Sequence, residues 1–164
     1  TPYKSSKRIR IVLSKKTKYA INALVYIARH VEEQPISASR IAMEQGIPLK
    51  FLESILTELK NARILNSRKG KYGGYALNGS PDEIDMARVM RLFDGAIAIL
   101  PCVSYTFYER CEECVDEETC GIRQIAMEIR SETVERLKAA TLTEILNREQ
   151  DLISSLQHRR ESQA

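Results

Sequence analysis

The stretch ISASRIAMEQGIPLKFLESILTELKNARILNSRKGKYGGYAL, residues 36–77, decides the fold of this chain. Its first part predicts a short helix over 37–45, then a tight turn at QGIP, then a longer helix over 48–62. The longer helix carries an apolar stripe at i, i+3, i+4 and i+7, formed by Leu52, Ile55, Leu56 and Leu59. One face of this helix is therefore expected to pack inward, which leaves the opposite, polar face available to a partner.

Two short extended runs come next, at 63–68 and 75–77, and the glycine-rich sequence KGKYGG between them suits a hairpin turn. Upstream, SKKTKYAINALVYIARH at 14–30 has apolar residues at helical spacing behind a capping Ser14. The order of these elements is that of a winged helix-turn-helix domain: a helix, a short helix, a tight turn, a third helix and a hairpin. In such a domain the third helix lies in the major groove of DNA and the hairpin, or wing, touches the flanking backbone.

Polar and basic side chains gather where such a domain would meet DNA. They lie opposite the apolar stripe of helix 48–62, at the hairpin tip and at the start of the first helix. Lysine and arginine in these places can contact phosphates, whereas Glu53 can accept a hydrogen bond from a cytosine amine. The candidate DNA-contacting residues are Lys50, Glu53, Ser54, Thr57, Arg68, Lys69, Lys71, Tyr72, Lys15 and Lys16.

The second half of the chain continues as helices around one long loop. Helices are predicted over 81–94, over 122–138 and from about residue 141 onward, and the loop separates the first two. The predicted fold class is therefore mainly α with a small β-wing. We expect two regions, a winged helix-turn-helix DNA-binding domain over residues 1–80 and a loop-and-helix region over 81–164.

Charge divides the chain near the same place. Residues 1–72 carry 15 basic and 5 acidic side chains and residues 73–164 carry 10 and 17, so a half of net charge +10 is joined to a half of −7. A basic half favours a polyanionic partner such as double-stranded DNA. No apolar run approaches the roughly 20 residues needed to cross a bilayer, so we expect no membrane segment and a cytoplasmic protein. Residues 1–10 lack an initiating Met and are interpreted as a processed end or a tag remnant.

All four cysteines lie in the loop, in the pattern C-x8-C-x2-C-x5-C, at Cys102, Cys111, Cys114 and Cys120. A reducing cytoplasm does not preserve disulfides, so this pattern favours metal or redox chemistry. Structural zinc, a metal-free dithiol switch at Cys111 and Cys114, and inert buried cysteines are all open interpretations. Six carboxylates crowd the same segment. Negative neighbours oppose thiolate formation, which disfavours the metal-free switch.

Three stretches resemble the Rrf2 regulators, a bacterial family of winged-helix DNA-binding proteins. They are LSKKTKYAINALVYIA, residues 36–77 and the later ARVMRLFDG, and the most specific part is IPLKFLESILTELKNARILNSRKGKYGGY. The resemblance spans residues 11–148. It implies a homodimer in which helix 122–138 crosses its partner while two third helices read a palindromic operator.

The resemblance also assigns base-reading positions. It implies that Lys50, Phe51, Glu53 and Ser54 contact bases and that the wing contributes from Arg68 onward. At Lys50 and Ser54 this sequence departs from well-known members of the family, so the operator sequence cannot be carried over.

Members of this family that carry cysteines in the loop usually have three, and many of those bind an iron–sulfur cluster. Cys102, Cys114 and Cys120 match that pattern, and Cys111 is additional. Lys18, which is a poor iron ligand, stands near the place where some members supply a carboxylate ligand. The resemblance therefore implies an all-cysteine iron–sulfur cluster, 2Fe–2S or 4Fe–4S, that acts as the sensor.

Two other classes of function compete with this interpretation. Cys111 and Cys114 form a C-x-x-C pair as in thiol oxidoreductases, but the strand–helix alternation and the acid–base residues of such an enzyme are missing from the sequence. The chain is therefore predicted not to be an enzyme. The second class is a dimeric adaptor that needs a protein partner. The resemblance implies this class too, because the branch of the Rrf2 family that regulates cysteine metabolism binds such a partner.

Overall fold

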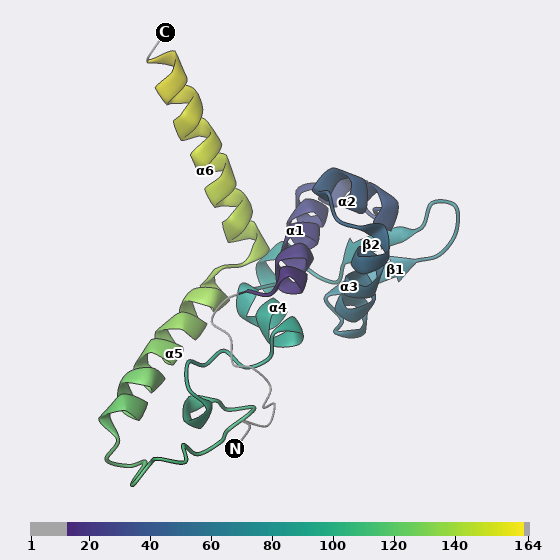
Figure 1. Ribbon diagram of the computed structural model, residues 1–164. Helices are drawn as coiled ribbons and strands as arrows, with labels where there is room; N and C mark the ends of the chain where they lie inside the picture. Colours follow the sequence, from purple (N-terminus) through teal and green to yellow (C-terminus); the bar gives the residue numbers. More distant parts are fainter. Residues whose placement is uncertain (1–12, 163–164) are drawn as a thin grey trace.

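Helix α1, Lys15–Arg29, lies at the centre of the winged domain in this computed structural model, which describes residues 13–162 (Figure 1). Ser14 caps the helix, because its hydroxyl accepts a hydrogen bond from the amide of Thr17 at 3.1 Å. One stripe of the helix is fully buried, and it consists of Ala20, Ala23, Leu24 and Ile27. Residues 1–12, which include the interpreted processed end, lie outside the described residues.

The helix-turn-helix follows the sequence prediction closely. Helix α2, Ala38–Gln45, is capped by Ser37 and ends at Gly46, whose φ of 60° is the left-handed conformation that glycine tolerates. Helix α3, Leu49–Asn61, follows, with Pro48 at the N-cap position rather than in the first turn. The predicted apolar stripe of α3 is completely buried. This packing fixes the direction in which the opposite face of α3 points.

The wing is a two-stranded antiparallel sheet of β1, Leu65–Arg68, and β2, Gly74–Leu77. It is anchored to the start of the helix-turn-helix, because Ile36 and Tyr75 exchange two backbone hydrogen bonds of 2.9 and 2.8 Å. A Cβ atom at Gly74 would lie 2.3 Å from the carbonyl oxygen of Ile36, so only glycine allows this close approach.

The prediction of a continuous helix over 81–94 was wrong at its start. Residues Pro81–Glu83 form a separate 3₁₀ turn, η2, inside a capping box, and helix α4 spans only Met86–Phe93 behind the N-cap Asp85. Between them Ile84 is extended and only 1% exposed. Burial of this one side chain in the core breaks the helical path, which local propensity does not reveal.

Two long helices complete the chain and leave the winged domain in different directions (Figure 1). Helix α5 spans Gly121–Ala139, close to the predicted 122–138, and helix α6 spans Leu142–Glu161. Short 3₁₀ turns occur at Val31–Glu33 (η1) and Pro101–Val103 (η3). Within residues 13–162 no helix is both long and apolar enough to span a bilayer.

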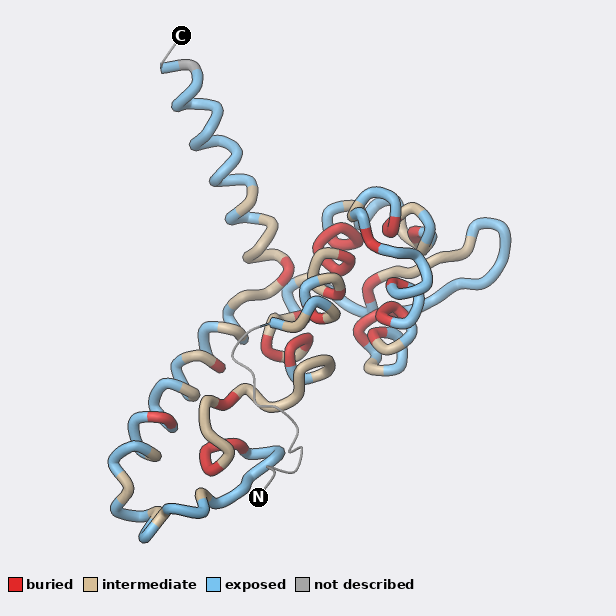
Figure 2. The backbone as a smooth tube through the Cα atoms, viewed as in Figure 1, coloured by how far each residue is buried: buried red, intermediate tan, exposed pale blue. Residues whose placement is uncertain are grey.

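Buried hydrophobic side chains form two separate clusters. Figure 2 marks the buried residues in red, in the winged domain as well as in the loop and α5. The large cluster unites the winged domain with η2, α4 and the start of α6. The small one lies between the cysteine loop and α5 and contains Ala98, Cys102, Val103 and Ala126. The rest of α5 and α6 is largely exposed in the single chain.

Substitution of Leu56 by Ala tests the large cluster. Leu56 is fully buried, and we expect the free energy of unfolding to fall by about 2–5 kcal/mol, because both the transfer of the side chain from water and its close packing are lost. Met43→Ala is the matched control, since Met43 is 74% exposed and its loss should change stability by less than about 0.5 kcal/mol. Urea unfolding measures both, and equal midpoints for the two variants would contradict the assigned core.

Candidate DNA-binding surface and cysteine loop

The outward face of α3 presents the side chains that the sequence assigned to DNA contact. Lys50, Glu53, Ser54 and Thr57 are all exposed. The Thr57 hydroxyl donates to the carbonyl oxygen of Glu53 at 2.8 Å, which occupies its hydrogen but leaves its lone pairs and methyl group facing outward. Because the four residues share one helix face, they can enter a major groove together.

Phe51 lies at the edge of the same face. Its side chain is 39% exposed, and its ring contacts the ring of Tyr19 in an edge-to-face arrangement with centroids 5.8 Å apart. Lys15 lies on the other side of Tyr19, with its ammonium 5.5 Å from the ring centroid. Tyr19 therefore links Phe51 of α3 to Lys15 at the start of α1.

The two predicted phosphate-contacting lysines of α1 differ in their surroundings. Lys15 is exposed and faces no carboxylate among the described ion pairs. Lys16 instead forms hydrogen bonds of 2.7 and 2.9 Å with both carboxylate oxygens of Glu58 on α3. Lys16 is thus a link between α1 and α3, a role that a separation of 42 residues hides in the sequence.

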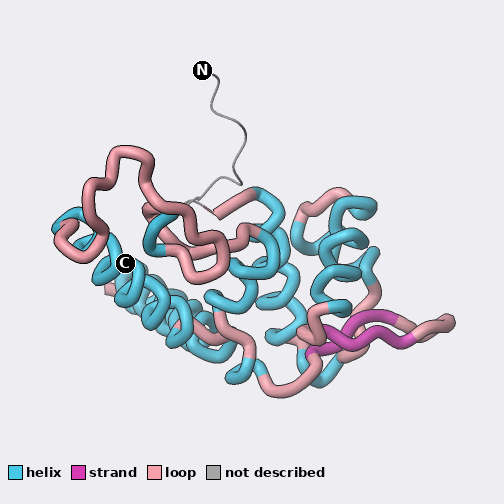
Figure 3. The backbone as a smooth tube through the Cα atoms, turned by 90° about the horizontal axis from the view of Figure 1, so that it is seen from below, coloured by secondary structure: helices cyan, strands magenta, loops and turns pink. Residues whose placement is uncertain are grey.

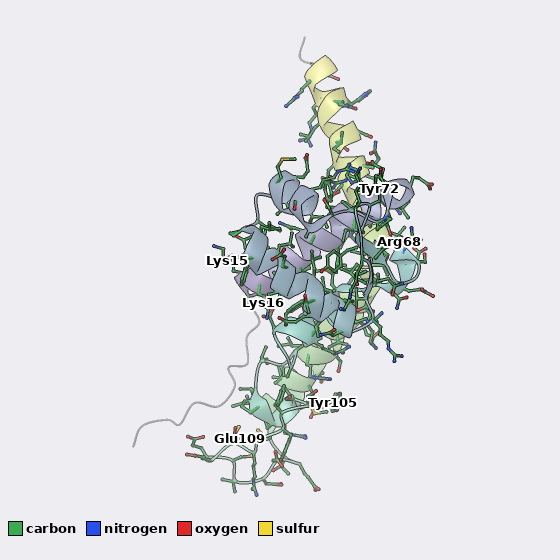
Figure 4. The ribbon with its side chains drawn as sticks, turned by 90° about the vertical axis from the view of Figure 1, so that its right-hand side faces the viewer. Lys15, Lys16, Arg68, Tyr72, Tyr105 and Glu109 are labelled. Carbon is green, nitrogen blue, oxygen red and sulfur yellow. The ribbon has the colours of Figure 1, made fainter. Side chains whose placement is uncertain are left out.

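The wing tip carries the remaining predicted residues, and all are exposed. Arg68 and Lys69 precede the turn, and Lys71 and Tyr72 lie within it. Tyr72 is 82% exposed, and the Lys71 ammonium lies 5.6 Å from its ring centroid. Figure 4, which looks toward the wing, shows Lys15 and Lys16 on one flank of the domain and Arg68 and Tyr72 on the other.

Two of the four cysteine thiols are in direct contact. The thiol of Cys102, which is only 4% exposed, lies 3.8 Å from that of Cys111. Cys114 follows in a turn whose amide donates to the carbonyl oxygen of Cys111 at 3.2 Å. Cys120 caps α5, because its sulfur accepts a hydrogen bond from the amide of Arg123 at 3.4 Å. Among residues 13–162, no three His, Cys, Asp or Glu side chains lie together in a geometry that could hold a metal ion.

The surroundings of two loop thiols, those of Cys102 and Cys114, raise their pKa. Burial raises the pKa of Cys102, and the neighbouring Cys111 adds to the increase, while Arg123 opposes it. Burial also raises the pKa of Cys114, and Cys120 contributes further. Burial is the largest cause at both thiols, and of the crowded carboxylates Glu117 contributes, at Cys114.

Internal hydrogen bonds give the loop a defined shape beside α5 (Figure 3). The Tyr108 hydroxyl donates to Glu117 at 2.6 Å, an interaction that raises the pKa of the tyrosine. The Arg110 guanidinium donates at 3.2 Å to the carbonyl oxygens of Cys114 and Val115. These bonds join the two halves of the cysteine segment.

The sequence reasoning missed two arginines of α5. Arg123 faces the loop and lies 3.8 Å from Glu117, and the guanidinium of Arg130 stacks on the ring of Tyr105 with 3.8 Å between them. The signal was available, since residues seven apart share one face of a helix.

A winged helix-turn-helix with an exposed polar recognition helix and a basic wing defines a DNA-binding transcriptional regulator as the class of this protein. The model of the Rrf2 family, described as an iron-dependent transcriptional regulator, matches residues 13–148. The chain belongs to this family, which confirms both the resemblance and the predicted fold class. The family and its named relatives are regulators, in agreement with the prediction that the chain is not an enzyme.

Individual relatives support the same assignment. An Rrf2-like helix-turn-helix regulator of Rhodobacter capsulatus is 35% identical over 138 residues, which cover 82% of this chain and 92% of the relative. The solved structure of CymR, the global cysteine regulator of Bacillus subtilis, is 27% identical with a TM-score of 0.69 and covers 83% of this chain and 96% of its own. The structure of IscR from T. potens has a TM-score of 0.66 at 23% identity, covering 85% and 88%, and supports the fold alone.

Substitution of Lys71 by Ala tests the wing. If Lys71 contacts a phosphate, the substitution should weaken binding to all duplex sequences alike. The slope of a plot of log affinity against log salt concentration should also become shallower by about one. Fluorescence anisotropy with duplex DNA at several salt concentrations measures both effects. Lys138→Ala is the control, since Lys138 lies on α5 and is paired with Glu135. Equal slopes for the two variants would remove Lys71 from the interface.

Proposed function

We propose that this protein is a homodimeric transcriptional regulator that binds palindromic operators and is controlled through its four-cysteine loop. The observation that supports it most is the division of α3 into a fully buried apolar face and an exposed polar face flanked by the wing and Lys15. Such a regulator acts on the chromosome, which favours the bacterial cytoplasm as its compartment.

The dimer is proposed from the surface of α5. Ile122, Ile125 and Ile129 are 73%, 60% and 44% exposed, and their spacing of three and four residues places them on one stripe. A continuous exposed apolar stripe is expected to be covered by another surface. A second copy of α5 would bury it and would bring two α3 helices into a twofold arrangement, which a palindromic site matches.

An iron–sulfur cluster is proposed as the cofactor, on the chemistry of the donor set. Four thiols within 19 residues of one loop supply the complete ligand set that 2Fe–2S and 4Fe–4S clusters require. Cys102 and Cys111 are already adjacent, and Cys120 stands at the N-terminus of α5. These four residues would hold the cluster once Cys114 and Cys120 approach the other pair, and the bound cluster would supply sensitivity to oxidants or nitric oxide. Zinc would fit the same four thiols.

Control of DNA binding follows from the position of the loop in the chain. The loop starts directly after α4, which packs on α1, and it ends at Cys120, the cap of α5. A change in the loop therefore acts on the recognition domain at one end and on the proposed dimer helix at the other. Only such a state-dependent difference in geometry can change affinity for an operator.

A second candidate is a thiol switch, and the 3.8 Å contact between Cys102 and Cys111 favours it. This pair differs from the Cys111 and Cys114 pair expected from sequence. Oxidation by a peroxide would remove two thiol protons and two electrons to form one disulfide and leave water as product. The raised pKa of Cys102 makes this reaction slow, because the thiolate is the reactive form.

Substitution of Ile125 by Glu tests the proposed dimer. A charge in the centre of the apolar stripe should convert the dimer to a monomer and lower affinity for a palindromic operator much more than affinity for a half-site. Analytical ultracentrifugation measures the first effect. Val115→Glu serves as the control, since Val115 is 95% exposed on the loop and should tolerate the charge. A stable Ile125→Glu dimer would show that another surface joins the protomers.

An anaerobic absorption spectrum, with iron, sulfide and zinc quantified on the same freshly purified sample, tests the cofactor. We expect broad visible absorption with equal iron and sulfide, lost in Cys102→Ser and in Cys120→Ser. Serine is the suitable replacement at position 120 because it can still cap α5. Colourless protein with one zinc per chain would make the loop structural, and metal-free protein with a Cys102–Cys111 disulfide would support the thiol switch.

A further inference from the structure

A small cavity lies between the cysteine loop and α5. Its volume is about 90 Å³. The loop contributes Ser104, Tyr105 and Tyr108 to its wall, and α5 contributes Arg123 and Arg130. Cys102 also borders it, but none of the other lining residues is a proposed cluster ligand or DNA contact.

Two charged donors at this cavity lack hydrogen-bond partners. The Nε atoms of Arg123 and Arg130 are both buried, and neither has an acceptor within hydrogen-bonding distance in the described residues. Buried N–H groups in folded proteins nearly always bond to protein, to ordered water or to an ion. A guanidinium is always charged, so its donors are especially costly to leave unsatisfied.

The charges around the cavity do not cancel. The Nε atom of Arg123 lies 3.8 Å from Oε1 of Glu117, an atom that is also buried without a hydrogen-bond partner in the described residues, whereas Oε2 of Glu117 accepts the hydrogen bond from Tyr108. Arg130 has no carboxylate within ion-pair distance among residues 13–162. Its guanidinium stacks on the ring of Tyr105 instead. One positive charge therefore remains uncompensated at a partly buried position, where a desolvated anion would interact with it strongly.

Ser104 supplies a further donor. It is only 3% exposed, and its oxygen accepts a hydrogen bond from the amide of Phe107 at 2.9 Å, so the hydroxyl hydrogen is free to point elsewhere. The buried serine of the loop and the guanidinium N–H groups of α5 form a set of donors that suits an acceptor-rich ligand.

We propose that this cavity binds a small inorganic oxyanion, of the size of nitrate or sulfate. The volume equals that of about three water molecules, which admits such an anion. Arg130, Arg123 and Ser104 donate to its oxygens. The bound anion joins the loop to α5 and holds the loop in its described shape. This inference uses the arginines and the cavity alone and does not depend on an iron–sulfur cluster.

Isothermal titration of the full chain with sodium sulfate, and separately with sodium nitrate, tests the proposal. Ionic strength is held constant with sodium chloride, so that only a specific site produces a saturable signal. We expect one site per chain in the unmodified protein and at least a tenfold loss of affinity in Arg130→Gln. Arg136→Gln is the matched control, because Arg136 is an exposed arginine on the same helix and its loss removes the same charge.

Further variants keep the outcome decisive. Ser104→Ala should weaken binding, and it stands in for Arg130→Gln if that variant fails to fold. Cys102→Ser should still bind the anion, which separates this site from the proposed cluster. DNA affinity is measured on the same samples, so a failed anion site and a failed regulator are distinguishable. No saturable binding, or equal binding by Arg130→Gln and Arg136→Gln, would assign the cavity to water and overturn the proposal.

Discussion

The burial of one face of α1 is the constraint on which the rest of the structure depends. Ala20 and Ala23 are small, so neighbouring helices approach the axis closely, and α1 packs against α2, α3, α4 and α6 as well as β2. All five of those elements therefore share one packing partner. The orientation of the recognition helix, α3, is therefore set by the packing of α3 and α4 against α1.

Polar links reinforce this arrangement at both ends of α1. At its start, the amide of Ser14 donates to Asp94 at the end of α4 at 3.2 Å, and Lys16 bonds to Glu58 on α3. At its other end, Arg29 pairs with Glu149 on α6. Asp94 immediately precedes the segment that leads to the cysteines. Two contacts, that of Asp94 with Ser14 and that of Lys16 with Glu58, therefore connect the end of α4 to α3. The proposed control can act on α3 through these contacts when the loop moves.

The parts of the structure that local sequence determines were predicted well. The stripe of α3, the cap at Ser37 and the end at Gly46 all depend on residues within a few positions of each other, so periodicity and cap chemistry were sufficient. Contacts between distant segments were not predictable in this way. The burial of Ile84, which delays the start of α4, and the pairing of Lys16 with Glu58 both depend on tertiary packing. For the loop, spacing identified four thiols as one group, but it could not show that Cys102 meets Cys111 while Cys120 caps a helix.

The two buried clusters share no side chains, and this separation has a consequence for how such proteins diversify. The large cluster supports the surface that meets DNA, whereas the small one supports only the loop and one face of α5. Substitutions in the loop therefore leave the packing of the recognition helix intact, and substitutions at the DNA surface leave the loop intact. Under the proposed function, a lineage can replace the stimulus to which it responds and keep its target genes, or change its target genes and keep the stimulus, by altering one cluster at a time.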